Sequence, residues 1–308
     1  MKKCFGLILA AMLVLAAFSG AVAEEPAPLK IVSTIFPGFD FARQLAGENA
    51  EIIILLPPGS DSHSFDPTPQ DILAIQNADL FIYNGGESDE WVRRLLESLG
   101  EDAPCTFAMM EHVTAEVAGH DHDHESDHGH HEEPLDEHVW TSPKNVMQIV
   151  AALQDTLCLI RPEWAETFAA NGERYQQELA ALDASFAELA EMSGGRPLIF
   201  GDRFPFRHLA AAYDFHYEAA FPGCSEDSEP SIKTIARLVS IIREENIPVV
   251  FHIEFSSRKT ADILAEETGA KVLLLHSCHT VSTEDIAAGA TYVSLMQQNI
   301  AALKEALN

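Results

Sequence analysis

The chain has few basic side chains: its 308 residues include 19 lysines and arginines against 48 aspartates and glutamates. This shortage argues against partners that carry negative charge, because nucleic acids and anionic membrane surfaces are bound largely through Lys and Arg. Beyond its first residues the sequence also lacks an apolar run of about 20 residues, the length that crosses a bilayer. The composition therefore favours cations as ligands.

Motifs of the common enzyme classes are also scarce. The sequence contains neither a G-x-S-x-G nucleophile motif nor a phosphate-binding P-loop. The tetrapeptide HSCH at 276–279 is similar to a short zinc-ligand cluster, but no second ligand pair follows at the spacing of a zinc finger. We therefore predict that the protein is not an enzyme.

The first residues are typical of a secretory signal peptide. Lys2 and Lys3 precede an apolar run, and Ala-Val-Ala stands before Glu24. The run is short for a membrane anchor, which is the alternative interpretation. We predict cleavage after 1–23 and export to the periplasm or to the outer face of the cytoplasmic membrane, where cysteines can form disulfides.

The apolar runs that follow predict an α/β fold. In the first half, LKIVST (29–34), EIIILL (51–56) and DLFIY (79–83) are expected to form strands, with EIIILL covered on both faces. Thr68 before Pro69 is typical of a helix start. Strands that alternate with helices in this way build a parallel sheet.

The second half repeats the alternation after one long helix. Tyr175, Leu179, Leu182, Phe186 and Leu189 form one apolar seam on a helix predicted over 162–193. Strands are expected at 197–202, 248–254 and 271–276, with helices around 205–213, 231–246, 258–268 and 284–306. The predicted fold is two parallel-sheet lobes bridged by one long rigid helix. The predicted parts are 1–23 (signal peptide), 24–161 (N-terminal lobe), 162–193 (connecting helix) and 194–308 (C-terminal lobe).

Within the predicted N-terminal lobe lies a segment that no hydrophobic core could hold. Residues 119–133 contain six histidines among Asp and Glu: His120, His122, His124, His128, His130 and His131. We expect this loop to be disordered and to act as an auxiliary metal-collecting segment, because imidazoles bind metal near neutral pH and release it on acidification. The alternative is a solvated spacer.

Metal-ligating side chains also stand near the ends of predicted strands. His63 follows the second strand, and His138 precedes a helix of the first lobe; Asp202, Glu254 and His276 close strands of the second lobe. Ligands of open parallel sheets bind at the carboxyl ends of strands, so these groups are expected to converge on the cleft between the lobes. Imidazole and carboxylate suit Zn²⁺ or Mn²⁺. Each residue also has an ordinary structural interpretation, such as a solvated loop histidine, an ion pair or a helix cap.

These features together resemble a known family. The segments PPGSDSHSFDPTPQD, EHVWTSPKN, AEETGAKVLLLH and YVSLMQQNIAALKEAL, with the long helix, are similar to the zinc/manganese substrate-binding proteins of bacterial ABC transporters (the cluster A-I type). The histidine-rich loop resembles that of the zinc members. The resemblance implies metal in the interface between two lobes, His63 and His138 as ligands, and an ABC permease as the partner.

The second lobe departs from the family pattern. Where the family has its third ligand, FGDRFPFRHL offers Gly201 or Arg203, and His276 stands where an Asp is common. The side chains that could complete the site are Asp202, His208, Glu254 and His279. We prefer Asp202 and Glu254, because they end strands.

A disulfide between Cys224 and Cys278 is expected in the second lobe. Some zinc members of the family carry a disulfide there, and loops that follow parallel strands emerge on the same edge of a sheet. The alternative is that Cys278 stays a thiolate and binds metal beside His276 and His279.

The function that the sequence predicts is capture of Zn²⁺ outside the cytoplasm and its delivery to an ABC importer by a monomer. A Mn²⁺ or Fe²⁺ carrier of the same fold is the near alternative. A surface adhesin with structural metal and a secreted zinc hydrolase are the alternatives from other classes.

Overall fold

The structure is a computed structural model that describes residues 26–60, 65–114, 136–221 and 230–308. The expected signal peptide, His63, the histidine-rich segment and Cys224 lie outside these ranges. Within them, no helix combines the length and the apolar character that a membrane crossing requires.

The first half of the chain forms a four-stranded parallel sheet in the order β2-β1-β3-β4. Its strands are β1 (Leu29–Ser33), β2 (Ala50–Ile54), β3 (Leu80–Tyr83) and β4 (Cys105–Ala108). The first three confirm the predicted strands. The short strand β4 was not predicted, because it contains no apolar run. The expectation that β2 is covered on both faces is wrong: β2 is an edge strand, and Ile53 is 51% exposed.

The second half forms another parallel sheet with the corresponding order, β6-β5-β7-β8. Its strands are β5 (Leu198–Phe200), β6 (Tyr217–Ala219), β7 (Val249–His252) and β8 (Lys271–Leu274). In each sheet the chain runs from the first strand to one neighbour and then crosses to the other side. The carboxyl ends of β1 and β3, and of β5 and β7, are therefore the switch points at which such sheets bind ligands.

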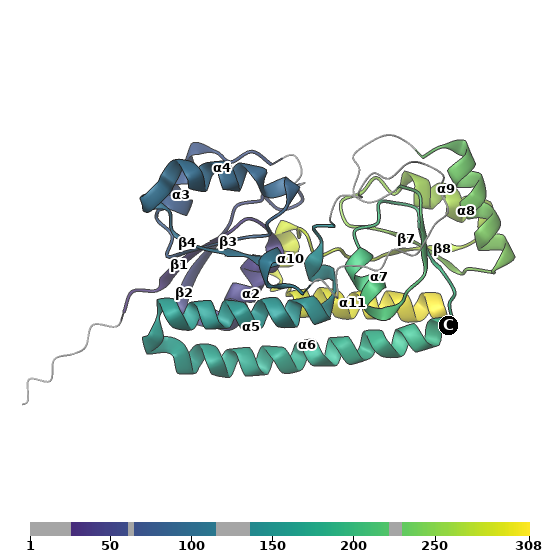
Figure 1. Ribbon diagram of the computed structural model, residues 1–308. Coiled ribbons are helices and arrows are strands. Elements are labelled where there is room, and N and C mark those ends of the chain that lie inside the picture. The colour runs from purple at the N-terminus through teal and green to yellow at the C-terminus, as the bar shows by residue number, and fades with distance from the viewer. Residues whose placement is uncertain (1–25, 61–64, 115–135, 222–229) are drawn as a thin grey trace, which may run out of the picture.

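Helices cover both sheets (Figure 1). Those of the first lobe are α2 (Phe36–Ala46), α3 (Pro69–Gln76), α4 (Glu90–Leu99) and α5 (Pro143–Ile160). The second half of the chain supplies α7 (Arg207–Tyr213), α8 (Ile232–Glu244), α9 (Lys259–Thr268), α10 (Thr283–Ala287) and α11 (Tyr292–Leu307), of which α10 lies beside the first lobe, near α2. Short 3₁₀ helices lie at Gly47–Asn49, Glu87–Asp89, Gly100–Asp102, Met109–His112, Val139–Thr141 and Pro162–Trp164. Thr68 caps α3 in a capping box with Asp71, as predicted.

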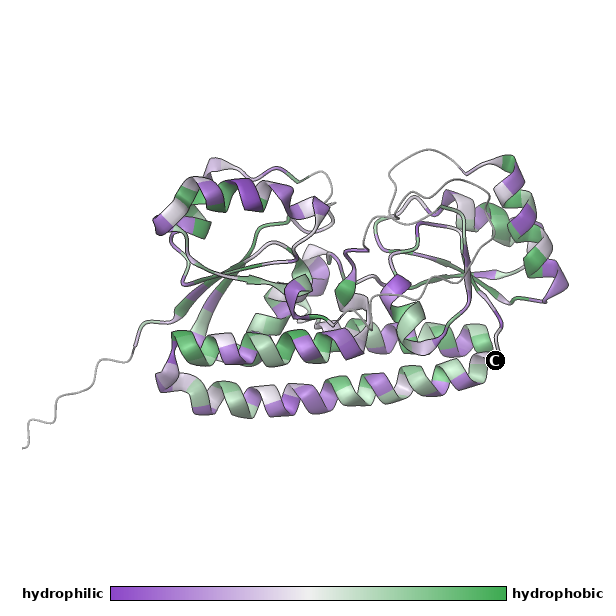
Figure 2. Ribbon diagram, viewed as in Figure 1, coloured by the Kyte–Doolittle hydropathy of each residue, from purple (hydrophilic) through white to green (hydrophobic). Residues whose placement is uncertain are grey.

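One long helix, α6 (Ala165–Ser193), runs beneath both lobes beside α5 and α11 (Figure 1). At 1.5 Å per residue its 29 residues span about 44 Å. The predicted seam of five apolar residues is buried along its whole length, and α5 and α6 alternate between hydrophobic and hydrophilic residues (Figure 2). Asn171 donates to the carbonyl of Leu45 in the first lobe, and Asp183 accepts from the Tyr213 hydroxyl in the second, so α6 contacts both lobes.

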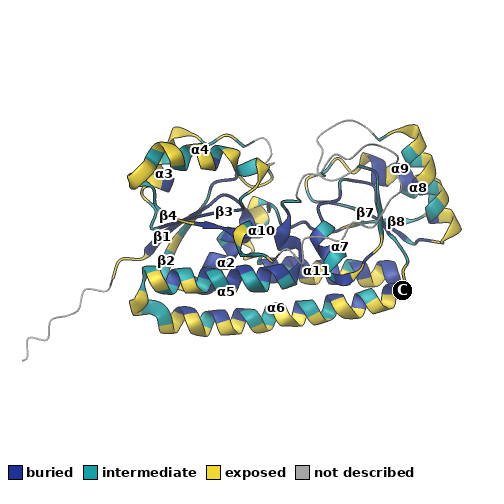
Figure 3. Ribbon diagram, in the orientation of Figure 1, coloured by how far each residue is buried: buried dark blue, intermediate teal, exposed yellow. Residues whose placement is uncertain are grey.

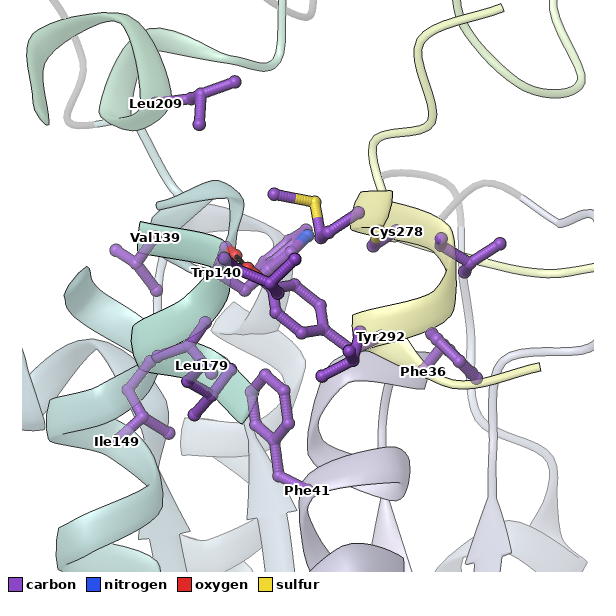
Figure 4. Close-up of a cluster of buried hydrophobic side chains, with 14 of the residues drawn as sticks. Phe36, Phe41, Val139, Trp140, Ile149, Leu179, Leu209, Cys278 and Tyr292 are labelled. Carbon is purple, nitrogen blue, oxygen red and sulfur yellow. Dashed lines mark hydrogen bonds between the residues drawn. The ribbon is translucent and has the colours of Figure 1, made fainter. Parts of the chain in front are cut away.

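A dry, hydrogen-bonded junction joins the lobes. Trp140 is 1% exposed and lies in one cluster of buried side chains with Phe41, Tyr292 and Cys278 (Figure 4). The Trp140 indole N–H donates to the Ser277 carbonyl at 2.9 Å, and the Tyr292 hydroxyl donates to the Trp140 carbonyl at 2.9 Å. The central strands β1, β3, β5 and β7 are largely buried as well, while the outer faces of α3, α4 and α8 are exposed (Figure 3). The junction therefore holds the strand ends of the two sheets in fixed positions.

Candidate metal-binding site

A cavity of about 150 Å³ lies between the two lobes. The first lobe lines it with Gly59 and Ser60, from the loop after β2, and with His138. The second lobe lines it with residues that follow β5, β7 and β8, namely Arg203, Pro205, Ile253, Glu254, Phe255, Ser277, His279 and Thr280. A larger surface groove between α5 and α6 has neither His nor Cys among the described residues that line it. The interlobe cavity is therefore the candidate site.

His138 lies in the cavity wall, as predicted, just before the 3₁₀ turn that leads into α5. Its Nδ1 is 2.7 Å from Asp136 Oδ1, and its backbone N–H donates to the same oxygen at 2.9 Å. An ionised carboxylate only accepts, so Nδ1 carries a proton and Nε2 holds the lone pair that can bind a metal. Its role as a ligand stays a prediction.

The surroundings of Asp136, whose carboxylate bonds His138, stabilise its charged form. Burial alone would raise the pKa of Asp136, but the hydrogen bond and charge of His138, with a smaller effect of His208, lower that pKa to about 2. His208 on α7 also places its Nε2 2.8 Å from the Asp136 carbonyl oxygen. His208 thus ties the second lobe to the segment that carries His138.

His279 faces the same cavity from the second lobe. Its ring centroid lies 5.7 Å from that of His138, with the rings nearly perpendicular, and 5.1 Å from that of Trp140. Its carbonyl accepts a bond from the Phe36 N–H across the junction at 3.4 Å. The sequence had offered His279 only as one of several candidates. The position of HSCH after a strand indicated that a ligand could lie there. It did not indicate which of the two histidines points into the cavity.

His276 is buried behind the cavity wall and does not line it. Its Nδ1 accepts from the Cys278 N–H at 2.9 Å. Its backbone N–H and carbonyl both bond the Asn299 side chain on α11, at 2.7 and 2.8 Å. These contacts hold the loop after β8 in place. The role of His276 as a ligand stays a prediction, and the geometry favours His279 over it.

Asp202, two residues after β5, likewise does not line the cavity. It is 6% exposed, and its two oxygens accept from the backbone N–H groups of Arg203 at 2.8 Å and Ile253 at 3.1 Å. The carboxylate therefore ties together the carboxyl ends of β5 and β7. That is a positioning contact at the switch point of the second sheet.

Glu254 does line the cavity, with a side chain that is 7% exposed. Both of its oxygens accept from Ser277: one from the backbone N–H at 2.8 Å and the other from the hydroxyl. Ser277 Oγ in turn accepts from the His279 N–H at 3.3 Å. Glu254 therefore supports the loop that presents His279, whether or not it also contacts a metal.

Of the two residues that stand where the family has its third ligand, Arg203 is the one at the cavity. Gly201 is buried, and a Cβ built on it would lie 2.4 Å from the Ala261 Cα of α9, so this position cannot carry a side chain. Arg203 lines the cavity together with His138, His279 and Glu254. The site thus has an arginine where the resemblance leads us to expect a metal ligand.

Several predicted residues lie outside the described ranges, namely His63, Cys224 and the six histidines of 119–133. Ser60 lines the cavity and Gly59 N donates to Thr280 Oγ1 at 3.1 Å, so the chain that precedes His63 is at the site. Cys278 carries a free thiol in the structure. Burial raises the pKa of this thiol well above its usual range, with added effects of Glu254 and Asp40. The Cys224–Cys278 disulfide therefore stays a prediction, without support from the described residues.

In the part of the chain that the structure describes, no three His, Cys, Asp or Glu side chains are grouped so as to hold a metal ion. The cavity offers two imidazoles, His138 and His279, one from each lobe. Zn²⁺ in proteins takes about four ligands, with an open position where the metal is exchanged or reacts. The two histidines thus form part of a coordination shell.

Comparison with known proteins bears on this arrangement. Residues 31–306 match the family model described as "Zinc-uptake complex component A periplasmic". The chain is 32% identical to the zinc-binding lipoprotein AdcA of Streptococcus pneumoniae over 90% of its own length and 55% of that protein. It therefore spans about half the length of this relative. It is 31% identical to the high-affinity zinc uptake system protein ZnuA of Bacillus subtilis, over 94% of this chain and 90% of that one.

A solved structure shares the whole fold. The Zn(II)-bound ZnuA-like domain of Streptococcus pneumoniae AdcA superposes with a TM-score of 0.74 at 29% identity. The match covers 91% of this chain and 99% of that domain. The two parallel sheets and the long helix described above are therefore a shared architecture.

Proposed function

This chain belongs to the family of periplasmic zinc-uptake component A, and we propose that it captures Zn²⁺ outside the cytoplasm and hands it to an ABC importer. The metal is cargo that binds and leaves, and the family is one of solute-binding transport proteins. The membrane permease of the importer is the proposed partner, and the protein works as a monomer. We place its lobes at 24–161 and 194–308, joined by the helix over 162–193.

The observation that carries this proposal is the pair of imidazoles in the interlobe cavity. His138 and His279 come from opposite lobes, and their ring centroids are 5.7 Å apart. Imidazole nitrogens favour Zn²⁺ and other late transition metals. The predicted ligand His63 would enter from the loop that follows Ser60, which lines the same cavity.

The hydrogen bonds that the carboxylates near the cavity accept favour zinc over manganese as the cargo. Mn²⁺ prefers oxygen ligands. Asp202 accepts from two backbone N–H groups, and Glu254 accepts from Ser277 with both oxygens. Their contacts hold loops together, so the groups that remain for a metal are mostly nitrogens.

In the proposed mechanism, Asp136 keeps a proton on His138 Nδ1 and so aims the Nε2 lone pair at the metal. Glu254 and Ser277 position the backbone of His279. The lobes are joined by buried hydrogen bonds from Trp140 and Tyr292. Exchange of the metal therefore proceeds by movement of the lining loops, and the histidine-rich segment 119–133 raises the local supply of zinc.

The test is a zinc competition titration of His138→Ala, His279→Ala, His63→Ala and His276→Ala. We expect the first three to lose at least about tenfold in affinity, the lower end of the loss that changes of outer-shell partners cause, because each removes a direct ligand. His276→Ala, matched in chemistry and located in the same loop as His279, should lose less. Unchanged affinity in both His138→Ala and His279→Ala would refute the proposed site.

A second measurement separates the main site from the histidine-rich loop. Deletion of 119–133 should lower the total zinc bound and leave one tight site per chain. Disappearance of the tight site with the loop would move the binding function to the loop itself.

A further inference from the structure

We propose that the side chain of Phe255 is a gate that controls how fast zinc enters and leaves the interlobe cavity. This inference rests on the proposed function and specifies how the cargo is exchanged. Phe255 lines the cavity from the loop after β7 in the second lobe, and Gly59 lines it from the loop after β2 in the first. These two are the exposed residues of the lining, whereas His138, Ser277 and Thr280 are buried. The cavity therefore opens to solvent where Phe255 and Gly59 meet.

The ring of Phe255 closes this opening by packing against Gly59. A Cβ built on Gly59 would lie 3.2 Å from Phe255 Cε1 and 3.4 Å from its Cδ1, so the ring edge occupies the place of a side chain. Gly59 has a φ of 76° in a turn in which the Ser60 N–H donates to the Pro57 carbonyl at 3.0 Å. The third residue of such a turn needs a left-handed backbone and is commonly glycine. Gly59 thus serves both the turn and the contact with the ring.

The Gly59 side of the opening is held in place by the second lobe. The Gly59 N–H donates to Thr280 Oγ1 at 3.1 Å, and Thr280 is 7% exposed and follows His279 directly in the loop after β8. Phe255, by contrast, is 55% exposed. Because Gly59 is anchored while more than half of Phe255 faces solvent, the ring is the part of the opening that can swing away.

The loop that carries the ring is strained in this closed arrangement. Phe255 and Arg258 have left-handed backbones, with φ of 56° and 54°. Between them, the Ser256 hydroxyl is buried without a hydrogen-bond partner among the described residues. Each of these features is unfavourable and persists only where the surroundings impose it. Strain that is released when the loop moves lowers the free energy needed to open the cavity.

The gate is separate from the contacts that orient His279. Those contacts are the hydrogen bonds between Glu254 and Ser277 and between Ser277 and His279, and the Phe255 side chain takes no part in them. Removal of the ring should therefore leave the ligand geometry in place and change the rates. One opening step precedes both binding and release, so a faster opening raises both rates together and leaves their ratio, the Kd, nearly constant.

The experiment measures both rates in the full protein by stopped flow. Zinc release is followed with a chromophoric chelator, at concentrations where the rate no longer depends on the chelator, and zinc binding is followed on mixing with free zinc. We expect Phe255→Ala to speed both steps about five- to tenfold, the factor that corresponds to half of the free energy of burying a Phe side chain, with the Kd within about threefold. Phe255→Leu should lie between Phe255→Ala and wild type. Leu274→Ala, which shortens an exposed apolar side chain of the same lobe outside the cavity lining, should behave as wild type.

A double-mutant cycle tests the contact itself. The Cβ of Gly59→Ala would displace the ring, so this variant should also release zinc faster than wild type. In the Phe255→Ala background the same change should add little, because the ring that it displaces is already absent.

Three outcomes would contradict these expectations. Unchanged rates in Phe255→Ala with tight zinc binding would overturn the gate and leave the proposed function intact. Faster release alone, with an equal loss of affinity, would also overturn it and make Phe255 part of the binding wall. Failure of the wild type to bind zinc tightly would overturn both proposals.

Discussion

The two lobes have the same strand order, yet they handle backbone strain differently. In the described residues of the first lobe, every residue with a left-handed backbone is a glycine, whereas the non-glycine residues of this kind all lie in the second lobe. They are Asp214, Asn246, Phe255, Arg258 and Cys278. Phe255 and Cys278 belong to the loops after β7 and β8 that form the cavity wall.

Strain of this kind persists only where the surrounding structure imposes it, and it gathers at functional sites. The loop after β8 is fixed by Asn299, His276 and Glu254, which together turn Cys278 inward and His279 toward the cavity. The first lobe orients His138 more simply, through a hydrogen bond to the carboxylate of Asp136, two residues earlier in the chain. The second-lobe half of the site therefore depends more on tertiary contacts.

The largest expected effect comes from breaking the junction that both lobes share. Trp140→Ala removes a fully buried ring and the bond to the Ser277 carbonyl, so we expect a loss of about 3–5 kcal/mol in the free energy of unfolding. Urea unfolding of the metal-free protein measures it. Trp91→Ala, in the partly buried part of the first lobe, is the control. A loss no larger than that of the control would show that the junction is not a shared core.

The next effect concerns Asp89 of the first lobe, whose contribution to stability should depend on pH. Burial, with a smaller effect of the nearby Glu137, raises the pKa of Asp89 to about 6, although hydrogen bonds from the N–H groups of Gly85 and Asn84 act to lower this pKa. Because the folded state binds this proton more tightly than the unfolded state, the contribution of Asp89 to stability grows as pH falls from about 6 to about 4.

We therefore expect wild type to gain up to about 3 kcal/mol over Asp89→Asn between pH 7 and pH 4. Urea unfolding of the metal-free protein at steps of one pH unit measures the difference, and Asp102→Asn on the exposed surface of the same lobe provides the baseline. A constant difference, or one of opposite sign, would contradict the assignment.

A smaller effect on stability is expected in the second lobe, where Asp202 holds two backbone N–H groups. Asp202→Ala leaves the N–H groups of Arg203 and Ile253 without their acceptor, which should cost about 1–3 kcal/mol of stability. Zinc affinity should stay within about twofold, an expectation from its place outside the cavity lining. Asp202→Asn, which keeps one oxygen acceptor, should lose less. A large loss of zinc affinity at unchanged stability would instead make Asp202 a ligand.

The smallest effect tests the strain itself. Phe255 has a φ of 56° and is 55% exposed, so little packing offsets its left-handed backbone. Phe255→Gly should be more stable than Phe255→Ala by about 1 kcal/mol, because both remove the ring and only glycine removes the steric cost of Cβ. Equal stability of the two variants in thermal unfolding would mean that the loop is not strained.

Much of the fold follows from local sequence pattern. Apolar runs mark β1, β2, β3, β5, β7 and β8, the seam of α6 is visible in its spacing, and Thr68 marks the start of α3. These features depend on neighbours within a few residues, which is why they can be predicted. The place of His138 in the cavity also follows from its position just before a helix of the first lobe.

The second-lobe half of the site could not be predicted in the same way. A strand pattern indicates where β8 ends, but the orientation of the loop after it depends on Asn299, which bonds the backbone of His276 from 23 residues away, and on Glu254 in the loop after β7, which bonds Ser277. The choice between a carboxylate that binds metal and one that bonds backbone, as in Asp202, likewise depends on which N–H groups lie opposite it in space. The sequence by itself determined most of the strands and helices and the kinds of ligand, but not the short strands β4 and β6. Only the tertiary structure decided which side chains face the cavity, because long-range hydrogen bonds orient the loops.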